Sequence, residues 1–258
     1  MARKISRQLS MKKFIAQSEA SKKILNIAQM SSSLPVNILI SGPIGVGKKL
    51  LTKVITSDAV VFDSFVLEQS LINKTVNIDE YQEIIVTNIH NVVNKKEFME
   101  YLKDVKIIAT TNSIPSEIES EFAIKIEIPP LQEREEDLKK LTDMYIEEAS
   151  SIYNLAVDIK EIEIDLSENG ISLKRSIYKN VLLKSLTKED IMESLEDYIL
   201  KEFDKQKDYK DLLEIFEIPL LKAAKIKYKS QVQMANNLNI NRMTLRKKLE
   251  QYSNSGIK

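Results

Sequence analysis

The sequence predicts an α/β fold in which a three-layer parallel sheet is followed by an all-helical C-terminal half. Three of the five glycines, Gly42, Gly45 and Gly47, lie within six residues of one another. An apolar run of strand length, 36–40, precedes this stretch, and residues 49–55, which follow it, are apolar at helical spacing. Strand-like runs then alternate with helical segments, and such alternation is typical of a three-layer α/β sheet.

The remaining elements of the α/β part follow in chain order. A helix is expected over 11–31, with Phe14, Ile15, Ile24, Ile27 and Ala28 on its apolar face, and Pro35 ends the connection to the first strand. After the glycine-rich stretch we expect short strand or core pieces at 60–62 and 65–67, a strand at 83–89, a charged helix at 95–103, a strand at 105–111 and a last alternating run at 122–128. Pro129 and Pro130 end this part.

The chain is predicted to be helical from Leu131 onward. Acidic residues 133–137 open a long helix, where carboxylates favour the positive end of the helix dipole. Two further helices are expected near 172–184 and 188–203, with Thr187 able to cap the second, and the Lys- and Asp-rich segment 201–210 is predicted to be a linker. We therefore predict an α/β domain over 1–130, a helical lid over 131–204 and a separate C-terminal domain over 205–258.

Composition restricts the classes of site that the chain can carry. The 258 residues include no cysteine and a single histidine, His90, which excludes disulfides, thiolate metal sites and a histidine metal cluster. No apolar run approaches the roughly 18 residues of a membrane span, and the basic N-terminus is not followed by the apolar core of a secretory signal. We expect a cytoplasmic protein with no membrane partner. His90 is interpreted as a strand-end residue.

The formal net charge of zero conceals an asymmetry along the chain. Residues 1–23 hold seven lysines and arginines against Glu19, and residues 222–258 hold nine against Glu250, so these ends carry net charges of +6 and +8. The middle of the chain is correspondingly acidic, at −14. If the protein binds a polyanion, we expect it to do so at the ends of the chain. The alternative for the N-terminal arm is that its lysines serve only solubility.

The stretch from Ser41 to Leu51 carries the pattern G-x-x-x-x-G-K between a strand and a helix, which is the context of a phosphate-binding loop. Its backbone amides, from residue 44 to 48, can form a nest for an anion, and Lys48 can reach phosphate groups. Lys49 stands where a magnesium-binding Ser or Thr is usually found, so it would place a positive charge near the phosphates instead. The alternative is a glycine-rich turn kept only for packing.

The C-terminal stretch predicts two short helices joined by a turn. Residues 230–238 form the first helix, 239–241 the turn and 242–252 the second helix. Five residues can pack the two helices together: Ala235, Leu238, Ile240, Leu245 and Leu249. This packing leaves Arg242, Thr244, Arg246, Lys247 and Lys248 on or near the outer face, which suits a helix-turn-helix whose second helix enters the major groove of DNA. The alternative is a basic, solvated helix in a small bundle.

The stretch Asn-Ile-Asn-Arg-Met-Thr-Leu-Arg-Lys-Lys-Leu-Glu-Gln-Tyr resembles the C-terminal helix-turn-helix of the Fis family. The resemblance places five residues at positions that this family uses for bases and phosphates: Asn241, Arg242, Thr244, Arg246 and Lys247. In that family the helices before the motif, here about 208–226, pair two subunits. The resemblance therefore implies a homodimer, or a higher homo-oligomer, that binds double-stranded DNA.

Residues of about 10–180 resemble the AAA+ domain of NtrC-type, sigma-54-dependent activators. Besides the phosphate-binding loop, the resemblance rests on Ile107-Ile-Ala-Thr-Thr-Asn112, which is similar to the sensor I strand, and on Pro129-Pro-Leu-Gln-Glu-Arg-Glu-Glu-Asp-Leu138, which is similar to the signature that opens the family's lid. Residues 170–177 resemble sensor II, with Arg175 as its arginine. The resemblance implies an AAA+ three-layer sheet, a small helical lid and bound ATP. The implied nucleotide-binding residues are Gly42, Gly45, Val46, Gly47, Lys48, Lys49, Asn112 and Arg175.

The sequence departs from the AAA+ pattern in three places. The strand that should end in Asp-Glu, the pair that holds magnesium and orients water, ends in Thr87-Asn88. The loop with which the family grips the sigma factor is missing, which argues against a contact with sigma-54 RNA polymerase. No arginine lies between Arg7 and Arg134, so arginine fingers are absent. We expect no catalytic residues and poor ATP hydrolysis, and the sequence leaves open whether Mg²⁺ is bound.

These observations predict a DNA-binding transcription regulator with an ATP-binding, hydrolysis-deficient AAA+ domain. One alternative is an active AAA+ ATPase in which Asp79 and Glu80, after a short strand at 76–79, supply the missing acids. Another is a Fis-like architectural DNA-binding protein with an inert body.

Overall fold

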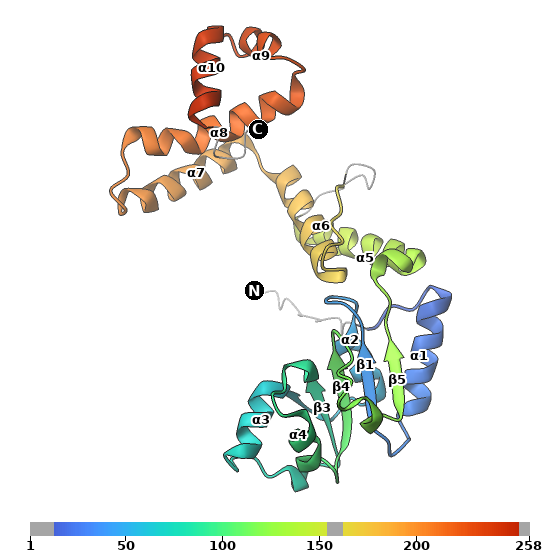
Figure 1. The fold of residues 1–258 in the computed structure, drawn as a ribbon. Coiled ribbons are helices and arrows are strands. Elements are labelled where there is room, and N and C mark those ends of the chain that lie inside the picture. Colours follow the sequence, from blue (N-terminus) through green and yellow to red (C-terminus); the bar gives the residue numbers. More distant parts are fainter. Residues whose placement is uncertain (1–12, 154–161, 253–258) are drawn as a thin grey trace, which may run out of the picture. The chain divides into compact units, whose positions relative to one another are not determined.

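A computed structural model describes residues 13–153 and 162–252, and its elements are labelled in Figure 1. The chain divides into two compact units, residues 1–185 and 186–258. Residues 188–203, which the sequence analysis assigned to the lid, belong to the second unit. The part of the N-terminal basic arm that precedes Lys13 lies outside the described residues. No described helix is long and apolar enough to cross a membrane.

The first unit is built on a five-stranded parallel sheet with the strand order β2-β3-β4-β1-β5. The strands are β1 (Ile38–Ser41), β2 (Val60–Asp63), β3 (Glu83–Thr87), β4 (Lys106–Thr111) and β5 (Ile124–Glu127). The register pairs Ser41 with Thr111 and Asp63 with Thr87. Because all pairs are parallel, the segments that follow the strands gather at one edge of the sheet, and this edge carries the glycine-rich loop.

Helices cover both faces of this sheet, as Figure 1 shows. Alternate residues of one strand point to opposite faces, so on β1 Leu39 joins one core while Ile38 and Ile40 join the other. The first core also packs α3 (Ser64–Ile72) and α4 (Lys95–Tyr101), and the second packs α1 (Glu19–Ser31) and α2 (Lys48–Ile55). The predicted three-layer α/β sheet is confirmed.

Two local expectations are wrong. Residues 65–67 do not form a strand; they lie in α3, because the side chain of Asp63 accepts the Phe65 N–H and caps the helix, and Leu67 is buried in the core. The first helix was predicted over 11–31, but residues 13–17 are not helical and α1 (Glu19–Ser31) starts after the cap Ser18. The first unit also contains four short 3₁₀ turns among the described residues: Ile78–Glu80, Ile89–Asn91, Glu119–Glu121 and Leu131–Glu133.

Two helices follow the sheet within the first unit, α5 (Glu135–Tyr153) and α6 (Gly170–Ser185). They form their own core around Ile146, Ala149, Leu173 and Ile177. The three acidic residues in the first turn of α5 agree with the start signal read from the sequence.

The second unit contains α7 (Lys188–Phe203), α8 (Tyr209–Lys227), α9 (Gln231–Asn237) and α10 (Arg242–Gln251). Thr187 caps α7 through a capping box with Asp190, as its sequence position indicated. The predicted linker over 201–210 is shorter than expected, because helix continues to Phe203 and resumes at Tyr209. Leu221, Ala224, Ala235 and Leu245 form the centre of the core that joins the last three helices.

Candidate functional site

The glycine-rich loop between β1 and α2 needs its glycines for two reasons. All three have positive φ angles, of 140° at Gly42, 79° at Gly45 and 107° at Gly47, in the region that L-residues rarely adopt. Neighbouring backbone also approaches closely. A Cβ atom at Gly42 would lie 2.4 Å from the carbonyl oxygen of Ile128, and one at Gly45 would lie 1.9 Å from that of Glu168. The loop is therefore held tightly between the sheet and the segment that leads into α6.

The carbonyl groups of this loop are all turned toward protein donors. Asn169 donates to the Ile44 oxygen at 2.8 Å, the Gly170 N–H to the Gly45 oxygen at 3.1 Å, and Arg134 to the Val46 oxygen at 3.1 Å. The N–H groups of residues 45–49 donate to no acceptor within the described part of the chain. Since consecutive unpaired N–H groups at a helix N-terminus form an anion-binding concavity, this loop has the chemistry of a phosphate site.

The ammonium group of Lys48 lies folded back over the loop. It donates to the oxygens of Gly42 at 2.5 Å and Pro43 at 2.7 Å, and to Asn112 Oδ1 at 2.9 Å. Burial lowers the pKa of Lys48 to about 8. Asn112, which follows β4, is therefore in contact with Lys48, so the structure brings together two residues selected independently in the sequence.

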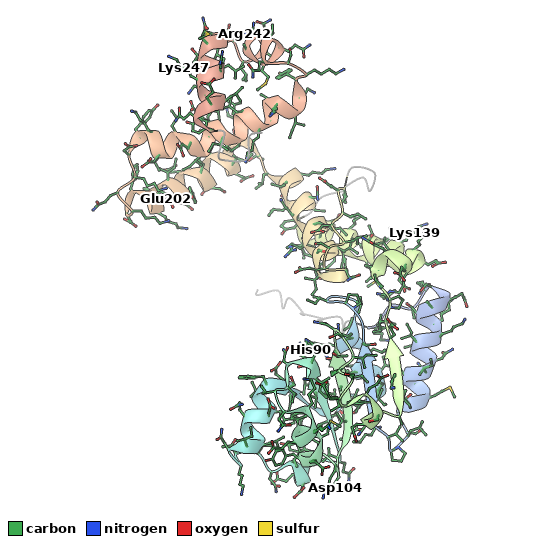
Figure 2. All side chains as sticks on the ribbon, in the orientation of Figure 1. His90, Asp104, Lys139, Glu202, Arg242 and Lys247 are labelled. Carbon is green, nitrogen blue, oxygen red and sulfur yellow. The ribbon has the colours of Figure 1, made fainter. Side chains whose placement is uncertain are left out.

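His90 was missed as part of this arrangement. Its Nδ1 lies 3.2 Å from Thr111 Oγ1, and it accepts the Asn112 N–H at 3.4 Å, so it supports the residue that holds Lys48. Burial lowers the pKa of His90, and the charges of Lys48 and Lys95 lower it further, which favours the neutral ring that can accept the Asn112 N–H. Figure 2 shows His90 at the end of the sheet opposite to Asp104. A lone histidine without a motif gives no sequence signal for such a role.

The carboxyl end of β3 presents no acid. Thr87 donates its hydroxyl to the Phe62 oxygen at 3.1 Å. Asn88 has a left-handed backbone with φ of 59° and donates its side-chain amide to Asp63 at 3.3 Å. Asp79 and Glu80, the alternative acids, lie in the 3₁₀ turn before β3, at the amino end of a strand whose other end faces the loop. Of these four residues, only Asn88 lines the pocket beside Lys48.

A pocket of about 880 Å³ lies over the loop within the first unit. Six charged side chains line it among the described residues, and all six are basic: Lys13, Lys48, Lys49, Arg134, Lys174 and Arg175. Apolar and aromatic lining comes from Ile15, Ile44, Leu131, Ile171, Tyr145 and Tyr178. Large pockets with apolar walls and a few charged groups are typical ligand sites, and the uniform sign of the charge selects an anion.

Arg175 and Lys174 lie side by side on α6 but in different surroundings. Arg175 is 64% exposed and its guanidinium lies 3.2 Å from Glu168. Lys174 lies 4.7 Å from the centre of the Tyr178 ring and 3.0 Å from Glu148. Both line the pocket, and Lys174 was not selected from the sequence.

A buried ion pair connects the start of α5 to the loop and to α1. Arg134, which donates to the Val46 oxygen, lies 3.5 Å from Asp137, and both side chains are almost completely buried. Asp137 also accepts the N–H groups of Gln17 and Ser18 and the hydroxyls of Ser18 and Ser21. Burial would raise the pKa of Asp137, but these hydrogen bonds outweigh burial and lower it. Both residues lie in the stretch 129–138 that opens the predicted lid, and that resemblance did not indicate this role.

In the second unit, the packing expected between α9 and α10 is confirmed. Ala235 and Leu245 are buried in one core, and Leu238, Ile240 and Leu249 pack against it. Asn239, with φ of 51°, makes the turn between the helices, and Asn241 caps α10 by accepting the Met243 N–H.

The basic residues of α10 have different environments. Arg242, Thr244, Arg246 and Lys247 are exposed, and Figure 2 marks Arg242 and Lys247 on this helix. Arg246 forms an exposed pair with Glu250 at 2.8 Å. Lys248 instead forms an ion pair with Glu217 of α8, whose other carboxylate oxygen accepts the Tyr252 hydroxyl at 2.8 Å. Lys248 therefore ties α10 to α8.

No family model matches the chain, and no curated protein matches it in sequence. Its fold matches solved structures. NtrX from Brucella abortus in complex with ATP is 15% identical over 93% of this chain and 69% of that chain, with a TM-score of 0.54. The complex of the same protein with ADP is 16% identical over the same shares, with a TM-score of 0.54. DnaA from Aquifex aeolicus bound to AMPPCP is 17% identical over 93% and 88%, with a TM-score of 0.44.

The likeness to NtrX, at this level of identity, shows the fold. The parallel sheet, its strand order and the helices around the glycine-rich loop match the fold of that protein and agree with the predicted AAA+ three-layer sheet.

Proposed function

We propose that this protein is a DNA-binding transcription regulator whose AAA+ domain binds ATP but hydrolyses it poorly. The observation that carries the nucleotide part is the loop at residues 42–49. Among the described residues, its N–H groups from 45 to 49 have no acceptor, and the charged side chains that line its pocket are all basic. The solved NtrX complexes with ATP and ADP, which share the fold, support the choice of ligand.

In this proposal, phosphates replace the loop oxygens as partners of Lys48. The ammonium group leaves Gly42 and Pro43 and binds phosphate oxygen, while the N–H groups of residues 45–49 bind the same chain of phosphates. Asn112, released from Lys48, has an amide free to contact the terminal phosphate. The apolar side chains at the other end of the pocket suit a nucleobase.

Poor hydrolysis follows from the end of β3. Attack of water on a phosphate needs a base to orient the water, and the strand end that faces the loop offers the hydroxyl of Thr87 and the amide of Asn88. Asp79 and Glu80 precede the strand and do not line the pocket, so the geometry does not favour an active ATPase built on them. ATP then acts as a ligand that favours one arrangement of the sheet and the lid helices.

The DNA-binding part is carried by α9 and α10. Arg242, Arg246 and Lys247 are exposed on a helix that follows a tight turn, in the arrangement that places a recognition helix in the major groove. Phe216 of α8, and Ile191 and Met192 of α7, are between half and two-thirds exposed, and such unpaired apolar side chains support the pairing of two copies. A homodimer would present two recognition helices to successive grooves.

Two measurements test this proposal. Equilibrium titration of ATP with the wild type and Lys48→Ala should give binding that the substitution weakens by at least tenfold, with no turnover above background. Absence of ATP binding by the folded wild type would refute the nucleotide part, and turnover that Asp79→Ala abolishes would refute the hydrolysis defect.

The DNA part is tested by titrating duplex DNA over a range of salt concentrations. Replacing Lys247 by Ala should weaken binding and reduce the salt dependence by about one released counterion, because one phosphate contact is lost. Lys201, a basic residue exposed on α7, provides the matched control. Equal effects of Lys247→Ala and Lys201→Ala would contradict the recognition-helix assignment. Binding without any sequence preference would instead favour a Fis-like architectural protein.

A further inference from the structure

The pocket over the loop is badly suited to Mg²⁺. This ion requires octahedral oxygen ligands, usually carboxylates or hydroxyls together with phosphate. In the part of the chain that the structure describes, no group of three or more His, Asp or Glu side chains could hold a metal ion. Lys49 occupies the second position of α2, where a hydroxyl would be needed, and it brings a positive charge instead.

The oxygens near the end of β3 are already engaged. The Thr87 side chain is buried and its hydroxyl donates to Phe62. Asp63 does not line the pocket, and both of its carboxylate oxygens accept hydrogen bonds, one from the Phe65 N–H at 3.2 Å and the other from Asn88 at 3.3 Å. A metal ion there would have to displace a helix cap and a side-chain contact between two strands.

The lysines at the loop have no acidic partner that would compete with phosphate. Among the described residues, neither Lys48 nor Lys49 lies within ion-pairing distance of a carboxylate, although both line the pocket. Arg134, Lys174 and Arg175 in the same pocket each have a carboxylate neighbour, in Asp137, Glu148 and Glu168 respectively. The uncompensated positive charge is therefore concentrated where the phosphates would lie.

We propose that the pocket binds its nucleoside triphosphate as the metal-free anion, with the ammonium group of Lys49 neutralising the charge that Mg²⁺ neutralises elsewhere. This rests on the proposed function and adds the ionic form of the ligand. Mg²⁺ withdraws negative charge from the triphosphate and adds a cation beside Lys48 and Lys49, so it competes with the protein for the same phosphate oxygens. The site thereby prefers free ATP to its magnesium complex.

The test is a calorimetric titration of ATP into the full chain, once in EDTA and once in excess Mg²⁺ at constant ionic strength. The wild type should bind ATP at least as tightly in EDTA as in Mg²⁺. Lys49→Thr, which restores the usual hydroxyl, should bind on the order of tenfold more weakly in EDTA, because a charged hydrogen bond is lost, and should regain affinity when Mg²⁺ is added. Lys53→Thr is the matched control, since Lys53 is exposed on the same helix outside the pocket.

The possible outcomes distinguish a failure of the metal-free form from a failure of the proposed ATP binding. Tighter binding by the wild type in Mg²⁺ would overturn the metal-free form while leaving ATP binding intact. If Asp63→Asn then removed that gain, Asp63 would be the missing magnesium ligand. Absence of binding in both buffers would overturn the proposed nucleotide site itself. Far-ultraviolet circular dichroism of Lys49→Thr confirms that the variant is folded, so that a lost affinity reflects the site.

Discussion

Substitution of Asp137 by Asn should destabilise the first unit more than any change at its surface. The carboxylate is fully buried and accepts hydrogen bonds from Gln17 at 2.5 Å, from the Ser18 N–H at 3.0 Å and from two serine hydroxyls. It also neutralises Arg134, whose guanidinium is equally buried. Asparagine at this position has no charge. An NH₂ group in place of Oδ2 would face the hydroxyls of Ser18 and Ser21 and the guanidinium of Arg134, all of which donate to Oδ2 or lie beside it in the wild type.

The magnitude follows from the class of interaction. Removal of one partner of a buried ion pair costs about 3–5 kcal/mol, since the other charge stays buried without compensation. A domain of this size loses roughly 2–4 °C of Tm per kcal/mol, so the Tm of Asp137→Asn should fall by about 6–20 °C. The measurement is thermal unfolding followed by circular dichroism. Asp143→Asn, an exposed change on the same helix, should shift the Tm by no more than about 2 °C.

The pH dependence gives an independent check on the same residue. The pKa of Asp137 is lower in the folded protein than its ordinary value of 3.8, so its ionisation stabilises the fold above that value. This stability is lost as the pH falls through the folded pKa, and the wild type should therefore lose stability in acid faster than Asp137→Asn does. A Tm for Asp137→Asn equal to that of the control, with the same acid dependence as the wild type, would refute the reasoning.

Two further predictions concern the loop. The affinity for ATP should fall about tenfold between pH 7 and pH 9, because Lys48, with a pKa of about 8, must be protonated to bind phosphate. Lys48→Ala should show no such decrease. Calorimetry at both pH values measures the two affinities, and an equal decrease in both proteins would contradict the prediction. Gly45→Ala should lower the free energy of unfolding measured in urea by at least about 3 kcal/mol, because its φ of 79° and the Glu168 oxygen both exclude a Cβ. An unfolding free energy equal to that of the wild type would contradict this prediction.

The amino-acid sequence alone determined the α/β fold class, the loop and the packing of the last two helices. These are local signals: Gly42, Gly45 and Gly47 can adopt the positive φ angles of the loop without steric cost, and Ala235 and Leu245 follow the helical period of short adjacent elements. The lack of an acid at the end of β3 could also be predicted from the sequence, because the apolar run of the strand ends at Thr87 and Asn88.

Only the tertiary structure decided which side chains act together at the loop. Arg134, Asn169 and Gly170 lie far along the chain from the loop. They bind the backbone oxygens of residues 44–46 because the segments before α5 and α6 pack against the loop, and the sequence does not indicate this packing. His90 reaches Asn112 because β3 and β4 are neighbours in the sheet, a fact that the spacing of the two residues does not encode.

The positive charge of the pocket also results from tertiary packing. Lys13, Lys49 and Lys174 come from three separate parts of a chain whose net charge is zero, and folding gathers them around one cavity. Sequence specifies which charges exist, but the electrostatic potential of a site depends on the distances between them, and those distances are set by packing.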